Sequence, residues 1–233
     1  MITIKVKKGW FRSVSLVIPS GWSDLTFRQF VQLLECDDET KAVEILTGQN
    51  ITIPESMYPY FDFFREKYDL DEIQPLHYLP FGGEIFEVPS IFGESFGKKI
   101  KLKMYLESKF EISKIHEVVS VYLPLTNEQL YACNFFDLYA VYVNIVNQYK
   151  SIIENENRAL SFNPDHIQVM AGIKNFAEFG DFNTVDMIAK EYNYTHEQVE
   201  NLEYSTIFLI LRKKAVEDAF QKSYATLKRT MKE

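Results

Sequence analysis

The end of the chain, Asp181 to Glu233, contains neither glycine nor proline. Because these two residues are the usual interruptions of a helix, the segment is expected to be helical throughout. Thr195, followed three residues later by Gln198, matches a capping box, in which both side chains satisfy amide groups at a helix start. A longer helix is expected from about Tyr204. The C-terminal part of the chain is therefore predicted to be a set of capped helices.

The long helix predicted from Tyr204 opens with a dense apolar run and continues with an apolar stripe to its end. The stripe comprises Val216, Ala219, Phe220, Tyr224 and Leu227. Such a helix needs a surface to cover it, and the opening run supplies four candidate partner-binding residues: Ile207, Phe208, Ile210 and Leu211. The alternative is that these four residues are core, which is the commoner fate of apolar helix stripes.

The front half of the chain adds a small β part. Apolar residues alternate with polar ones over residues 2–6 and again over 14–18, which predicts a β-hairpin. Thr26 and Gln29 form a second capping box before a helix. A further helix is expected over 38–46, with Gly48 ending it. Residues 84–88 alternate like a strand, whereas residues 100–106 fit either a strand or a helix.

Further helices are expected from the middle of the chain onward. Residues 51–54 read as an extended link, and residues 58–68, 112–122 and the segment opening at Asn163-Pro164 read as helices. A 3-4-3-4-3 spacing of apolar residues from Phe135 to Ile152 predicts a helix packed against a neighbour. The fold class is therefore mainly α with a small β part, with an N-terminal β-hairpin plus helices and a C-terminal helical bundle. We expect an α+β region over 1–125 and a helical region over 126–233, or one continuous domain. No internal repeat is apparent.

Charge and composition argue against several classes of function. A formal net charge of −8 disfavours general binding to nucleic acid or to anionic membranes, since both need a basic face. The two cysteines, Cys36 and Cys133, match no metal or redox spacing. The longest apolar run is far shorter than the roughly 20 residues that span a membrane. We expect a soluble intracellular protein with no cofactor and no metal.

One motif of catalytic type is present. Residues 93–97 match the G-x-S-x-G nucleophile elbow, with Ser95 as the candidate nucleophile. The elbow needs a buried parallel strand before it and alternating β and α units around it, but Pro89 interrupts the preceding segment. The motif therefore lacks its structural context, and a serine hydrolase stays a remote alternative.

The tail pattern resembles that of phage tail assembly chaperones. The resemblance rests on a short helix, a capped short helix and the link Glu200-Asn201-Leu202-Glu203-Tyr204 into a longer helix. The segment Gly97 to Thr126, and especially Val119 to Thr126, is also similar to structural-region proteins of phages that infect gut Bacteroidota. The chain is longer than the common small chaperones and adds a β-containing front half.

The resemblance implies a non-enzymatic bacteriophage assembly protein in the host cytoplasm. Such a chaperone shields apolar helical segments of a tape-measure protein until tail-tube subunits replace it. The alternative is a structural virion component, such as a neck or portal ring or head-tail connector protein. Other phage structural proteins are the expected partners, with no nucleic acid and no membrane, and a homo-oligomer is possible.

Overall fold

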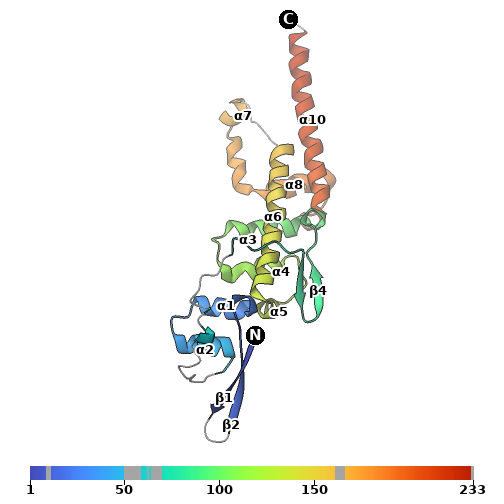
Figure 1. Cartoon of the computed structure of the whole chain (residues 1–233). Helices are drawn as coiled ribbons and strands as arrows, with labels where there is room; N and C mark the ends of the chain where they lie inside the picture. The colour runs from blue at the N-terminus through green and yellow to red at the C-terminus, as the bar shows by residue number, and fades with distance from the viewer. Residues whose placement is uncertain (9–11, 50–58, 62, 64–69, 161–165, 232–233) are drawn as a thin grey trace. The chain divides into compact units, whose positions relative to one another are not determined.

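The computed structural model describes residues 1–8, 12–49, 59–61, 63, 70–160 and 166–231. Over these residues the protein is mainly helical with a small β part, which consists of two antiparallel two-stranded sheets (Figure 1). The predicted fold class is therefore confirmed. The predicted link over 51–54, most of the predicted helix over 58–68 and the predicted helix start at 163–164 lie outside the described residues.

The chain divides into two compact units that are interleaved along the sequence. Unit 1 comprises residues 1–88 and 109–145, and unit 2 comprises residues 89–108 and 146–233. This division does not coincide with the predicted boundary between residues 125 and 126. The reason is that the helix over residues 135–159 contributes to both units, so that no single cut in the sequence separates them.

Unit 1 begins with a hairpin and contains mostly short helices. Its elements are β1 (Ile2–Lys8), β2 (Arg12–Ile18), η1 (Trp22–Asp24), α1 (Phe27–Leu34), α2 (Glu39–Thr47), β3 (Tyr78–Phe81), β4 (Glu84–Glu87), η4 (Ile112–Lys114), α4 (Ile115–Ser120), α5 (Asn127–Ala132) and the first part of α6 (Phe135–Ala159).

Unit 2 is helical. Its elements are η3 (Ile91–Gly93), α3 (Phe96–Glu107), the rest of α6, α7 (His166–Met170), η5 (Ile173–Phe179), α8 (Asp181–Tyr192), α9 (His196–Glu200) and α10 (Tyr204–Thr230).

Local sequence signals explain several of the element boundaries. The predicted hairpin is present, with Ile4 opposite Leu16 in the register of β1 and β2. Thr26 and Gln29 form the predicted capping box at the start of α1. Asp38 caps α2, and Gly48 ends it with φ of 66°, a left-handed conformation that glycine adopts without steric cost. The predicted capping box at Thr195 starts α9.

The ambiguous segment over 100–106 belongs to α3. Its buried residues are Phe96, Lys99 and Leu102, which recur every three residues as one helix face requires. Met104, which extends the apparent two-residue alternation, is exposed. The alternation therefore arose from apolar residues on different faces of one helix.

The two units contain the same arrangement of helix starts. In unit 1 an isolated antiparallel bridge joins Thr26, which caps α1, to Asn134, just before α6. In unit 2 the equivalent bridge joins Ser95, which caps α3, to Glu203, just before α10. Ser95 follows Thr26 by 69 residues, and Glu203 follows Asn134 by the same 69 residues. Each pair thus holds the start of a short helix against the start of a long one.

The contacts around each bridge repeat with the same offset. The ring of Phe27 stacks on Phe135 with centroids 6.3 Å apart, and the ring of Phe96 stacks on Tyr204 at 6.1 Å. In each unit a capping box of the form T-x-E-Q starts the helix that precedes the long one, and α1 packs on α5 as α3 packs on α9. The sequence analysis missed this internal repeat because few residues are identical between the two copies.

Candidate partner-binding surface

Helix α10 is anchored at its first residue. The Tyr204 amide donates a hydrogen bond to the Glu94 carbonyl at 2.8 Å, and the Phe96 amide donates to the Leu202 carbonyl at 2.8 Å. The Tyr204 side chain is fully buried. These contacts fix both the position of α10 in unit 2 and its rotation about its own axis.

A buried polar cluster reinforces this anchor. Lys99 is only 3% exposed, and its Nζ lies 2.7 Å from Glu156 Oε1 and 4.7 Å from the centroid of the Tyr204 ring. The Tyr204 hydroxyl donates to the same Glu156 oxygen at 2.7 Å. Burial, followed by the hydrogen bond to Glu156, raises the pKa of Tyr204 well above its usual value. The hydroxyl therefore stays a neutral donor, and the cluster joins α3, the end of α6 and the start of α10.

Helix α10 has a buried face and an exposed apolar face on opposite sides. Tyr204 and Ile207 are buried. At about 100° per residue, Leu209 lies on the opposite side of the helix from these two residues. Leu209 begins an apolar row that stays within an arc of about 80°. We call this row the α10 exposed face; it consists of Leu209, Val216, Phe220, Tyr224 and Leu227, each more than half exposed.

The four predicted partner-binding residues lie outside that arc. Ile207 is fully buried and is a core residue of unit 2. Phe208 is half-buried and its ring contacts those of Phe92 and Tyr204. Ile210 and Leu211 are half-buried as well. Helical spacing alone places Leu209 and Ile207 on opposite sides of α10. Only the tertiary contacts of Tyr204 show which of these two sides packs against the rest of unit 2.

The repeat provides an internal reference for the exposed face. Leu209 corresponds to Ala140 of α6, which is 3% exposed in unit 1, whereas Leu209 is 62% exposed. The segment before β3 covers that part of α6, because the Leu76 amide donates to the Ala140 carbonyl at 3.1 Å. The buried Asn144 amide donates to the Leu76 carbonyl at 2.8 Å. The same surface on α10 has no such cover among the described residues.

The distal half of α10 continues this exposed surface. From Val216 to Met231 every residue is exposed, and Figure 1 shows the end of α10, in red, extending beyond α8. The distal part of α6 differs, since its Ile152 is buried in unit 2. Among the described residues, the α10 exposed face is therefore a row of five apolar side chains on one helix that are all more than half exposed.

Ser95, the candidate nucleophile, has a structural role. It is the N-cap of α3, and its hydroxyl accepts a hydrogen bond from the Lys98 amide at 3.4 Å. The short 3₁₀ turn η3 precedes it, and the strand before that, β4, belongs to an antiparallel hairpin. The Gly-x-Ser-x-Gly match thus coincides with the start of a capped helix. Serine is a preferred N-cap residue, so capping alone accounts for the serine at position 95.

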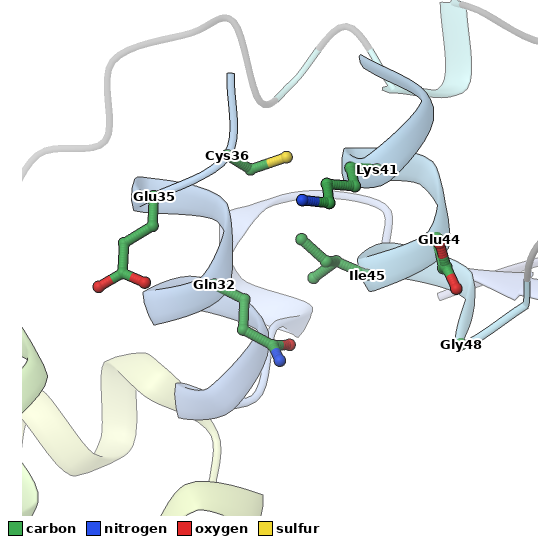
Figure 2. A pocket seen from close by; sticks show the side chains of 7 residues that line it. All are labelled: Gln32, Glu35, Cys36, Lys41, Glu44, Ile45 and Gly48. Carbon is green, nitrogen blue, oxygen red and sulfur yellow. The ribbon is translucent and has the colours of Figure 1, made fainter. Parts of the chain in front are cut away.

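A polar surface pocket lies between α1 and α2 in unit 1 (Figure 2). Three of its seven lining residues are charged, and Cys36 donates a hydrogen bond from Sγ to the Asp38 carbonyl at 3.2 Å. The lining residues are Gln32, Glu35, Cys36, Lys41, Glu44, Ile45 and Gly48. In the described part of the chain, no group of three or more His, Cys, Asp or Glu residues is arranged to hold a metal ion.

Comparisons with known proteins add no assignment. No protein-family model matches the chain, and neither the curated proteins nor the solved structures contain a match. Among the described helices, none combines the length and the apolar character that crossing a membrane requires. The α10 exposed face is thus the feature on which a functional proposal can be built.

Proposed function

We propose that this chain is a non-enzymatic assembly protein of a tailed bacteriophage that works in the host cytoplasm. Its role is to shield apolar helical segments of a tape-measure or other tail protein, as a tail assembly chaperone does. The observation that carries the proposal is the α10 exposed face, an apolar row on a helix whose opposite side is already buried. Helix-in-groove recognition uses such rows at i, i+3, i+4 and i+7.

The exposed side chains suit a reversible partner contact. Val216, Phe220 and Leu227 are 61–62% exposed, so each has most of its area left to bury. Fully burying one such side chain contributes about 1.5–3 kcal/mol, and part of that gain is offset by the cost of association. A row of five therefore supports binding that is specific enough to protect a partner and weak enough to be displaced.

The resemblance of the tail pattern to phage tail assembly chaperones supplies the identity of the partner class. The structure adds that α10 is anchored through its first turns, so its distal half can contact a partner without rearranging unit 2. A structural virion component is the second candidate, because a permanent subunit contact also buries an aromatic and aliphatic row of this kind.

Co-purification from infected cells tests the proposal. A tagged chain is expected to recover the tape-measure protein, and Phe220→Asp combined with Leu227→Asp is expected to abolish recovery. Met104→Asp is the control, since Met104 is an apolar residue of similar exposure on α3 of the same unit. Recovery that survives the α10 changes would refute the proposed surface.

Mass spectrometry of purified particles separates the two candidate functions. A chaperone is absent from particles although it is present in infected cells. A neck, ring or connector protein is present in fixed copy number. Detection of the chain in particles at a constant ratio to the portal protein would replace the chaperone proposal with the structural one.

A further inference from the structure

We infer that the helix docking on the α10 exposed face carries acidic side chains beside its apolar stripe. This inference rests on the proposed function, because it specifies the chemistry of the partner that the same face binds. It excludes as preferred partners a basic helix, a second copy of α10 and an anionic membrane.

The charge of α10 is opposite to that of the rest of the chain. Within α10, six residues are cationic (Arg212, Lys213, Lys214, Lys222, Lys228 and Arg229) and two are anionic (Glu217 and Asp218). The helix therefore has a formal charge of +4 in a chain of −8, which leaves −12 on the remaining residues. Charge complementarity at a contact rim selects partners of the opposite sign.

The cations lie where a docking helix would meet them. At about 100° per residue, Lys213 falls within the apolar arc, and Arg212 and Lys228 fall on its two sides. Glu217, also beside the arc, pairs with Lys213 at 3.5 Å, but both side chains are mostly exposed. An exposed pair of this kind is weak. The rim of the face is therefore predominantly basic.

The internal repeat shows which residue occupies the position equivalent to Lys213 in unit 1. Its counterpart in unit 1 is Asn144, whose amide donates to the Leu76 carbonyl and so holds the segment that covers α6. An amide suits a neutral carbonyl, whereas an ammonium group favours a carboxylate. The change from Asn to Lys at the equivalent position predicts a covering segment that presents Asp or Glu at this point.

Unit 2 already contains one helix held in this way. The distal part of α6 buries Ile152, and one turn later its Glu156 receives the Lys99 ammonium at 2.7 Å. Unit 2 thus already packs against a helix in which an aliphatic residue is followed four positions later by a carboxylate. We expect the same pairing on the α10 exposed face.

Two other occupants fit the charges less well. Pairing α10 with α10 of a second copy would bring two helices of +4 together, and the repulsion would oppose association. An anionic membrane would attract α10 but repel the −12 of the remaining chain. Lys213 would also lie within the membrane-facing stripe.

Peptide binding to the full chain tests the inference. Two fluorescein-labelled helical peptides share one leucine stripe and differ only in having Glu or Lys at every flanking position. Fluorescence anisotropy at low salt should show the Glu peptide binding about tenfold more tightly, because several individually weak rim pairs add. Arg212→Glu combined with Lys228→Glu should reverse the preference. Lys150→Glu combined with Lys174→Glu, which changes the net charge equally at exposed sites off α10, should leave it intact.

The outcomes separate this inference from the proposed function. Equal binding of both peptides, abolished by Phe220→Asp, would overturn the acidic partner while supporting the apolar docking face. Binding of neither peptide would overturn both. Sedimentation of the chain with phosphatidylglycerol vesicles, or self-association that Phe220→Asp abolishes, would assign the face to a membrane or to a second copy and would also overturn the inference.

Discussion

Glu156→Ala is expected to destabilise unit 2 more than any other single change in the buried polar cluster. The substitution leaves the Lys99 ammonium, which is nearly fully buried, without its counterion, and it removes the acceptor of the Tyr204 hydroxyl. Removing one partner of a buried ion pair costs about 3–5 kcal/mol. Because the Glu156 side chain is 20% exposed, water can enter the site, and we expect the lower end, about 3 kcal/mol.

A fully apolar version of the cluster is the informative comparison. Unit 1 has Phe30 and Phe135 at the positions equivalent to Lys99 and Tyr204, and their rings stack with centroids 3.5 Å apart. The triple variant Lys99→Met, Glu156→Leu and Tyr204→Phe removes both charges and the hydroxyl together. Replacing a buried ion pair with apolar residues of similar volume is often neutral or stabilising. We expect its stability within about 1 kcal/mol of the wild type.

Urea unfolding measures both variants. Far-ultraviolet circular dichroism reports the helices of both units, whereas both tryptophans of the chain precede residue 89 and so report unit 1. Glu156→Ala should lower the circular dichroism midpoint more than the fluorescence midpoint. If the triple variant loses as much stability as Glu156→Ala, the cluster stabilises the fold through its own attraction, and the argument from an uncompensated buried charge is wrong.

Three further predictions concern single sites. Gly97→Ala should fail to give the gain of about 1 kcal/mol in urea unfolding that Ala normally brings over Gly within a helix, since a Cβ there would lie 3.3 Å from the Glu200 carbonyl oxygen and α9 would have to shift slightly; the full gain would contradict this close approach. Thr195→Ala should cost about 1 kcal/mol through loss of the capping box, with Thr195→Ser as the control that retains it. Ellman's reagent should label the half-exposed Cys36 rapidly and the buried Cys133 only on unfolding. Burial raises the pKa of Cys133 to about 11, so its stabilising contribution is complete below about pH 9 and is lost as the pH rises toward 11; Cys133→Ala should therefore show a shallower loss of stability over that range than the wild type.

Much of the local structure could be predicted because short-range signals determine it. Thr26 and Gln29 make their capping hydrogen bonds within one helical turn, and Gly48 needs only its own left-handed conformation. Such signals depend on neighbours in the sequence, so they can be recognised without tertiary information. The segment over 100–106 is the counterexample, since its period could be assigned only once the buried side of α3 was known.

The internal repeat could not be predicted because its two copies share their backbone arrangement but few of their residues. Equivalent positions carry different chemistry: Phe30 corresponds to Lys99, and Phe135 to Tyr204. What is common is that two chain segments 108 residues apart meet in an antiparallel bridge at two helix starts. A contact at that separation has no local sequence signature.

Only part of the α10 exposed face could be predicted from the sequence, because the rest depends on tertiary contacts. The apolar stripe from Val216 to Leu227 follows from helical spacing alone. Which residues of the opening run face outward depends on the rotation of α10, and the Tyr204 amide bonded to Glu94 sets that rotation. The outward residue is Leu209, which is not among the four residues predicted from the sequence, whereas the core residue Ile207 is one of them.

The placement of these features predicts that stability and partner binding are separable in α10. The groups that hold the helix, Tyr204 and Ile207, lie in its first turn and face unit 2, whereas Phe220 and Leu227 lie several turns later on the opposite side. A polar residue at an exposed position loses little in the free chain, because the position is already in water. Phe220→Asp should therefore remove partner binding with a urea midpoint close to that of the wild type, while Glu156→Ala should lower the midpoint and leave the exposed face chemically intact. If Phe220→Asp instead destabilises unit 2 by several kcal/mol, the row is buried within the free protein and the docking surface does not exist.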